Sequence, residues 1–553
     1  MGPIDDLANR YVDEWAELSP IGATYFGIAG HDGATDDFSP AGFEAQAELT
    51  RRTLNDLDVI DPEHESEQVA KEAMQERLGL ELARHDAGFT ASEISVISSG
   101  LHALRGVFDV MPTEGEEAVA NIAARLNDLP RALEQYKTTL RVEAEAGRVS
   151  ARAQMLAVAE QCDAWTDPDR DDFYRGLAGR LTANGALAAE LTRGADAATA
   201  ATADFAEFLR GELAPRGRDK EAAGLERYEL ASQYFLGAKV DLQETYLWGF
   251  AELDRLEREM AVVSAAIAGP GASIDQAVAA LDADPARNIP GKEAFRAWMQ
   301  ALADKAIAEL NGTHFDIEPP ARRIECCLTP TSDGGIYYTA PSEDFSRPGR
   351  TWYPTLGKTR FPLWREVSIC YHEGVPGHHL HLTQRMRCAD TLSTFQMTLG
   401  SVSAETEGWA LYSERLMDEL GFFTDPGRRL GFLDDQMLRT IRVIIDIGMH
   451  LELVIPADSP FHPGERWTPE LATAFFAAYN GSPASMRESE IVRYLGWPGQ
   501  AIGYKLGERA WRAGREQARA RQGAGFDLKA WHMKALSQGA FGLGDLTEQL
   551  AGL

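Results

Sequence analysis

The sequence has no long apolar run, and its first residues do not follow the pattern of a secretory signal. No stretch of the 553 residues approaches the roughly 18 consecutive apolar residues that a membrane-spanning helix needs. The chain starts with an acidic, polar segment, whereas a secretory signal begins with basic residues followed by apolar ones. The sequence therefore predicts a soluble, cytoplasmic protein that does not associate with a membrane.

Cysteine and basic residues are also few. The five cysteines are an odd number and include no Cys-x-x-Cys pair, which argues against a disulfide framework and a structural zinc knuckle. The formal net charge is −31, which disfavours nucleic acid and anionic membranes as partners because both bind concentrated positive charge. The charge is compatible with a cationic or neutral substrate, or simply with a solvated acidic surface. The oligomeric state stays open.

The chain has enough hydrophobic residues to form a large helical core. Hydrophobic residues make up 44% of it, and Leu7, Tyr11 and Trp15 follow one another at helical spacing. We predict a mainly α-helical, two-lobed clamshell around a deep cleft. Its N-terminal helical lobe would cover residues 1–225 and its catalytic lobe residues 226–553, with one continuous fold as the alternative.

Residues 334–354 depart from this helical pattern. Aromatic and β-branched residues lie between glycines and prolines there, which favours short strands. An edge strand can pair with an extended peptide, so Tyr338 and Arg347 are candidate substrate-binding residues. A small sheet that only supports its neighbours is equally compatible.

The most informative segment is Tyr371–His381, which gathers four of the twelve histidines around Glu373. Neutral imidazoles are good zinc ligands, and a carboxylate beside the first ligand is placed to deprotonate a metal-bound water. The segment resembles the zinc-peptidase signature His-Glu-x-x-His with two residues inserted. The alternative is a Pro-Gly loop whose histidines are satisfied by hydrogen bonds.

The insertion requires a break in the helix. At about 100° per residue, an unbroken helix would separate His372 and His378 by about 600° and place them on different faces. His379 fits the face better but lies about 10 Å further along the axis. Pro376 and Gly377 favour a kink or bulge there. We take His378 as the second ligand and His379 as a residue in contact with the ligands, although the two could exchange roles.

A third ligand is expected on a later helix. Zinc peptidases of the glutamate type take a carboxylate from a helix roughly 25 to 30 residues downstream. The run Ser403–Glu414 has a helical pattern, and Glu407 is the first choice, with Glu405 in reserve. Glu414 is a candidate for orienting a ligand histidine. Any one of these glutamates alone could instead belong to a solvated helix face.

Two segments carry a family resemblance: His-Glu-x-x-Pro-Gly-His at 372–378 and Glu-Gly-Trp-Ala-Leu-Tyr at 407–412. With shorter matches along nearly the whole chain, they make the sequence similar to the bacterial family known as domain of unknown function 885. The resemblance implies a mostly helical fold like that of thimet oligopeptidase and angiotensin-converting enzyme. It also implies a zinc site.

A polar line runs along a later apolar helix. Arg439, Arg442, Asp446 and His450 follow at spacings that place them on one face. Buried polar groups need partners, so Asp446 and His450 could belong to a network that orients the metal ligands. Alternatively, Arg442 binds a substrate carboxylate, or the line makes ordinary salt bridges between helices.

Near the C-terminus, Tyr494 and Tyr504 flank a Gly/Pro turn. Similar zinc peptidases use a tyrosine late in the chain to stabilise the oxyanion, so Tyr504 is the first candidate and Tyr494 the second. Arg493 is a candidate for binding a substrate carboxylate. Tyrosines packed under a loop are the structural alternative.

These features predict a zinc-dependent metallopeptidase of oligopeptides. His372, His378 and Glu407 would hold one Zn²⁺ per chain, and Glu373 would act as general base and then protonate the leaving amine. One alternative is a metal-dependent hydrolase or lyase of a non-peptide amide or specialised metabolite. The other is a non-catalytic scaffold that binds peptides.

Overall fold

The computed structural model describes residues 2–170, 172–329, 335–342, 345–355 and 357–553. Across these ranges the chain is mainly helical, as predicted, with a few short strands. It divides into two compact units. The first consists of Met1–Ala231, Ser393–Leu399 and Glu488–Pro498, and the second of Ser232–Leu392, Gly400–Arg487 and Gly499–Leu553. The predicted clamshell with its cleft stays a prediction.

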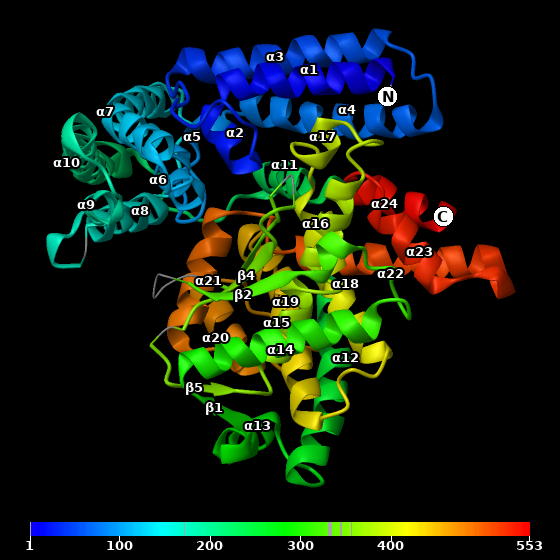
Figure 1. Cartoon of the computed structure of the whole chain (residues 1–553). Helices are drawn as coiled ribbons and strands as arrows, with labels where there is room; N and C mark the ends of the chain where they lie inside the picture. The colour runs from blue at the N-terminus through cyan, green and yellow to red at the C-terminus, as the bar shows by residue number, and fades with distance from the viewer. Residues whose placement is uncertain (1, 171, 330–334, 343–344, 356) are drawn as a thin grey trace. The chain divides into compact units, whose positions relative to one another are not determined.

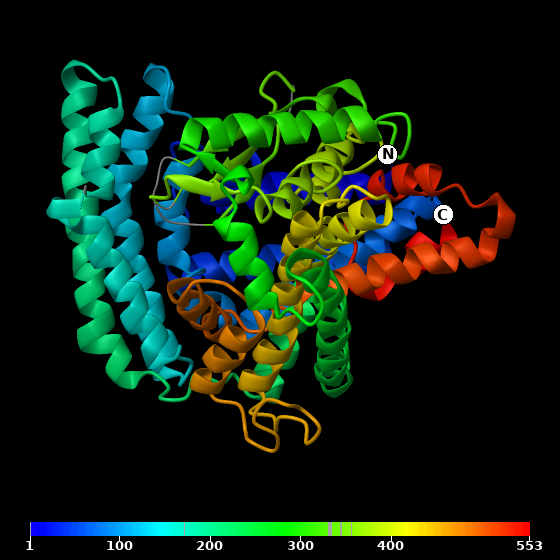
Figure 2. The ribbon, with the colours of Figure 1, turned by 90° about the horizontal axis from the view of Figure 1, so that it is seen from below.

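The first unit is built from long helices that pack side by side. α1, α3 and α4 lie together (Figure 1). Leu7 and Tyr11 of α1 share one core with Leu49 of α3 and Met74 of α4. α7 and α10 run alongside each other around a second core (Figure 2). The helices are α1 (Pro3–Leu18), α2 (Pro20–Phe26), α3 (Pro40–Val59), α4 (Glu65–Asp86), α5 (Phe89–Ser92), α6 (Gly100–Val110), α7 (Glu116–Glu145), α8 (Arg152–Thr166), α9 (Phe173–Arg180), α10 (Gly185–Phe208) and α17 (Thr394–Met397).

The second unit is centred on α19, whose residues from Gln436 to His450 are all buried. The helix begins where the Asp425 side chain accepts the N–H of Arg428 at 3.0 Å. Helices α12, α15, α18, α20 and α22 pack against it. The helices are α12 (Leu242–Ala268), α13 (Ile274–Ala283), α14 (Lys292–Leu310), α15 (Glu366–Glu373), α16 (His378–Arg387), α18 (Ser403–Glu419), α19 (Pro426–His450), α20 (Pro469–Tyr479), α22 (Gly503–Gln522), α23 (Leu528–Leu536) and α24 (Leu543–Gly552). α11 (Leu225–Leu236) and α21 (Ala484–Gly496) each contain a boundary between the units.

A small three-stranded sheet precedes the histidine-rich segment in the chain, as predicted. Its order is β2-β4-β3, with β2 parallel and β3 antiparallel to β4. Gly334, where the predicted extended region starts, lies outside the described residues. A separate antiparallel pair joins β1 to β5. The strands are β1 (Asn288–Pro290), β2 (Ile324–Leu328), β3 (Tyr337–Thr339), β4 (Gly349–Tyr353) and β5 (Arg360–Pro362).

Among the described residues, no helix combines the length and the apolar character that a bilayer crossing requires.

Candidate metal centre

His372 and His378 lie on either side of a helix break. α15 ends one residue after His372 and α16 begins at His378, so residues 374–377 form the predicted interruption. Gly377 donates its N–H to the carbonyl of Tyr371 at 3.0 Å, and a Cβ on Gly377 would lie only 1.9 Å from the carbonyl oxygen of His372. Glycine is therefore required at 377, and the turn brings the two imidazole rings to 4.8 Å between centroids.

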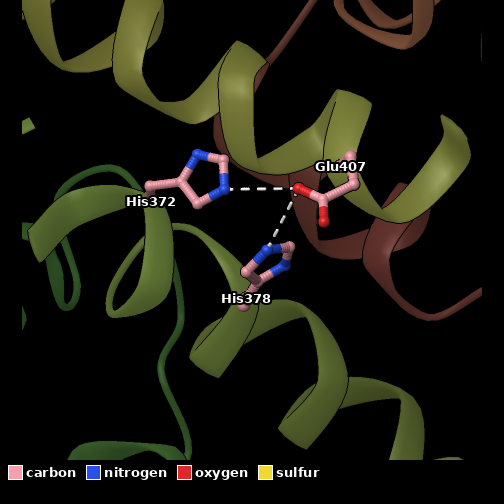
Figure 3. A group of neighbouring side chains, drawn as sticks. All are labelled: His372, His378 and Glu407. Carbon is pink, nitrogen blue, oxygen red and sulfur yellow. Dashed lines mark ion pairs between the residues drawn. The ribbon is translucent and has the colours of Figure 1, made fainter. Parts of the chain in front are cut away.

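Glu407 of α18 completes a group of three. The ligand atoms of His372, His378 and Glu407 all lie within 4.8 Å of one another. Figure 3 shows both rings directed at one carboxylate oxygen: Nε2 of His372 is 3.3 Å and Nε2 of His378 is 3.5 Å from Oε2 of Glu407. No other group of this kind occurs among the described histidines, cysteines and acids.

The donor set fits zinc. Two imidazole nitrogens and a carboxylate oxygen are the protein ligands of a common type of catalytic zinc site. Ligand atoms about 2.0–2.1 Å from one tetrahedral ion are about 3.3 Å apart, which matches the separations from Glu407 to the two rings. Oε2 of Glu407 is buried and accepts no hydrogen bond from a described residue, so a cation would satisfy it.

His372 is oriented by a second carboxylate. Its Nδ1 lies 2.7 Å from Oε1 of Glu414, the residue predicted for such a contact, and Ser368 donates its hydroxyl to the other oxygen of Glu414 at 2.6 Å. All three side chains are buried. Because Nδ1 donates to Glu414, Nε2 is the nitrogen left to bind a metal.

The electrostatics of the centre favour a cation. Burial acts to lower the pKa of His372, but the adjacent carboxylates of Glu407 and Glu414 raise it to about 10. Burial acts to raise the pKa of Glu407, but the two histidines hold it well below its usual range. Carboxylates that favour an imidazolium also favour a divalent metal ion in the same place.

Glu373 is buried beside this group. Burial raises its pKa, while the charges of His378 and His372 act in the opposite direction. Arg439 of α19 also lies close enough for its charge to lower the pKa of Glu373. A carboxylate beside the ligands is in the right place to exchange a proton with a reacting molecule.

His379 points away from the ligands, contrary to the prediction of a contact with them. Its Nε2 lies 3.1 Å from the carbonyl of Ala321, and its Nδ1 lies 2.9 Å from the hydroxyl of Tyr338. Both nitrogens are thus engaged. Tyr338 is therefore tied to His379, and Gly349 is required between them because a Cβ there would lie 2.2 Å from the Tyr338 hydroxyl.

Glu405, the reserve ligand, forms a different buried group. Arg385 of α16 donates to both of its carboxylate oxygens at 2.9 Å, and Nε2 of His381 is 3.1 Å from Oε1. Burial acts to raise the pKa of Glu405, but Arg385 and His381 lower it to about 2. This group ties α16 to α18 rather than holding the metal.

Helix α22 approaches α18 very closely. A Cβ on Gly408 would lie 2.4 Å from the Cα of Gly507, and one on Gly507 would lie 2.0 Å from the carbonyl oxygen of Ala404. The same helix carries the half-buried Tyr504, whose ring has Arg442 at 4.9 Å and Arg439 at 5.9 Å. Arg439 thus lies against the Tyr504 ring, and its charge also acts to lower the pKa of Glu373.

The polar line on α19 is buried. Asp446 and His450 are fully buried; Nε2 of His450 is 3.6 Å from Asp446, and Asp446 accepts the N–H of Gly499 at 2.9 Å. Burial acts to raise the pKa of Glu414, but His372 and then the charge of Arg439, a residue of this line, lower it.

Three further candidates have partners in their own segments of the chain. Tyr494 and Arg493 belong to the first unit, where both contact the carboxylate of Glu490. Arg347 donates to the carbonyls of Ala340 at 2.9 Å and Pro348 at 3.3 Å, which braces the connection between β3 and β4. These contacts give each side chain a local structural partner.

Sequence reasoning missed Ser368, and it missed Trp409 as a hydrogen-bond donor. Ser368 could have been found because it precedes His372 by one helical turn. The sequence put Arg439 on the polar line of α19 but could not position it, because its place depends on how α19 packs against α15 and α18.

These observations define the class: a mainly helical protein with a candidate metal centre of two histidines and one glutamate. The chain belongs to the family described as "Bacterial protein of unknown function (DUF885)", which it matches over residues 20–550. None of the curated proteins matches the chain.

Two solved structures share the fold. One is described as the "putative lipoprotein from Colwellia psychrerythraea"; it is 21% identical, with a TM-score of 0.85 over 99% of this chain and 98% of the other. The second is described as a "putative lipoprotein of unknown function from Shewanella oneidensis"; it is 19% identical, with a TM-score of 0.74 over 100% of both chains.

Proposed function

We propose that the protein is a zinc-dependent metallopeptidase that hydrolyses oligopeptides. The observation that carries the proposal is the convergence of His372, His378 and Glu407, with Glu373 buried beside them. A zinc ion bound there would polarise a carbonyl and lower the pKa of a water molecule. The donor set and the orphaned oxygen of Glu407 support zinc as the metal.

Other residues of the chain would transfer the proton, orient a ligand and stabilise the oxyanion. The Glu373 carboxylate takes a proton from the attacking water and delivers it to the leaving amine. Glu414 keeps His372 in the correct tautomer through Nδ1. The hydroxyl of Tyr504, whose ring lies against Arg442 and Arg439, would donate to the carbonyl oxygen as negative charge develops on it.

The test starts with zinc content. We expect about one zinc per chain in protein purified without chelator, because two histidines and one glutamate form a catalytic type of site. His378→Ala should lose it. His379→Gln is the control, since His379 contacts Tyr338 and Ala321 instead. Folded parent protein that takes up no zinc on reconstitution would refute the metal centre.

Activity is tested next, on zinc-loaded protein with a panel of short peptides and small amides. Glu373→Gln should retain zinc and lose about 10²-fold or more in turnover, as expected for removal of a general base. Turnover of non-peptide amides alone would favour the alternative hydrolase. Binding of peptides without turnover would favour the scaffold.

The cytoplasmic location also remains a prediction. Both structural neighbours are described as putative lipoproteins, but these descriptions concern those proteins. Fractionation of the native cells, with detection of this chain in each fraction, tests it directly.

A further inference from the structure

The two ligand histidines are held in different ways. His372 has a carboxylate partner, because its Nδ1 contacts Glu414 at 2.7 Å. Nδ1 of His378 is buried and has no hydrogen-bond partner among the described residues. A ligating imidazole normally has its second nitrogen anchored, so the position of the His378 ring depends on the backbone that carries it.

That backbone is contacted by a buried tryptophan. The indole N–H of Trp409 donates to the carbonyl of Pro376 at 2.9 Å, two residues before His378. Trp409 is fully buried, and its ring packs against Tyr412 and Trp511 at centroid distances of 5.3 and 4.9 Å. The indole is therefore a fixed donor aimed at a turn that is otherwise held by its own backbone.

We infer that Trp409 is a positioning residue for the metal centre: its hydrogen bond to Pro376 holds the turn that places His378 opposite His372. Trp409 is two residues beyond Glu407 and five before Glu414 on α18. One helix thus carries a ligand, the partner of His372 and the residue that fixes His378. The inference rests on the proposed metal site.

The direct test compares Trp409→Phe with Trp531→Phe. Trp531 is the matched control because it is also buried and donates its indole N–H to a backbone carbonyl, that of Leu550 at 2.8 Å, in the same unit. Zinc affinity is measured by competition with a chelator. We expect Trp409→Phe to lose about 10- to 100-fold, the usual effect of removing an outer-shell partner, and Trp531→Phe to change by less than about twofold. An equal loss in both, or no loss in Trp409→Phe, would overturn the inference.

A second variant covers the case in which Trp409→Phe fails to fold. A tryptophan analogue with sulfur in place of the ring N–H, introduced at 409 alone, keeps the shape and removes only the donor. Unchanged zinc affinity in this variant would also overturn the inference.

Hydrogen exchange of the metal-free protein separates the two proposals. Without the hydrogen bond from Trp409 to Pro376, as in Trp409→Phe, amide exchange should be faster at Gly377 and His379. These two amides donate to the carbonyls of Tyr371 at 3.0 Å and Gly374 at 3.1 Å. Faster exchange in the variant, together with no zinc bound by the parent, would support the role of Trp409 in holding the turn and refute the metal site. Unchanged exchange would refute the role of Trp409 itself.

Discussion

Two adjacent histidines, His378 and His379, differ in which atoms their ring nitrogens contact. Nε2 of His378 faces Glu407, whereas both nitrogens of His379 are engaged by Tyr338 and Ala321. Burial lowers the pKa of His379 to about 4, so its ring is neutral. Residue type made both histidines candidates, but hydrogen-bond partners decide which one is available to a metal.

A buried histidine away from the centre predicts how stability depends on pH. Nε2 of His532 lies 2.8 Å from the Tyr412 hydroxyl, to which Arg515 also donates at 3.2 Å. Burial, and then the charge of Arg515, lowers the pKa of His532 from 6.5 to about 3. The unfolded chain therefore takes up this proton first as the pH falls below 6.5.

We expect His532 to stabilise the fold fully above pH 6.5 and to lose this contribution progressively toward pH 3. The free energy of unfolding should fall by up to about 1.4 kcal/mol per pH unit on its account. His532→Gln, which keeps an acceptor for Tyr412, should flatten the slope in urea titrations between about pH 6.5 and 4. Identical slopes in parent and variant would contradict the assignment.

Among the elements, α18 contributes the most residues to the candidate metal centre and its surroundings. It supplies Glu407, Glu414 and Trp409, and it can do so only because α15 and α16 pack against it with a break between them. The packing of α18 against α22 depends on two glycines, Gly408 and Gly507. This packing also sets the place of Tyr504 relative to α18.

Gly507→Ala should therefore be strongly destabilising. The added Cβ would lie 2.0 Å from the Ala404 carbonyl oxygen, so α22 would have to move away from α18. Overpacking of this kind costs about 1–3 kcal/mol, measured as the free energy of urea unfolding. Gly525→Ala is the control, because no atom lies within 4 Å of its added Cβ. Equal stability of the two variants would show that the helices separate without cost.

For the whole molecule, the division into two units confines the candidate centre to one of them. His372, His378 and Glu407 all belong to the second unit. A metal that binds only the folded state stabilises the part that holds it. Metal removal should therefore act on one unit and leave the other unchanged.

Exchange measured with and without EDTA tests this at the level of segments. In zinc-loaded protein, chelation should speed amide exchange in α15, α16 and α18 and leave α7 and α10 of the first unit unchanged. His378→Ala is the control, because it should show no response to the chelator. A uniform response across both units would mean that the chelator acts elsewhere.

The sequence alone determined the helical class, the small strands before the histidines and the helix break at 374–377, and it made Glu407 the first candidate for the third ligand. These features depend on local spacing, on proline and glycine, and on residue chemistry, which act over a few residues. The spacing of His372 and His378 already required the break, because an unbroken helix would place them on different faces.

Only the tertiary structure decided between His378 and His379, paired Glu405 with Arg385, and placed Arg439 near Glu373. It also showed the indole N–H of Trp409 donating to the carbonyl of Pro376. Each of these outcomes depends on a partner many residues away. Helical periodicity specifies which face is buried but not which atom lies opposite, and the packing of helices settles the latter.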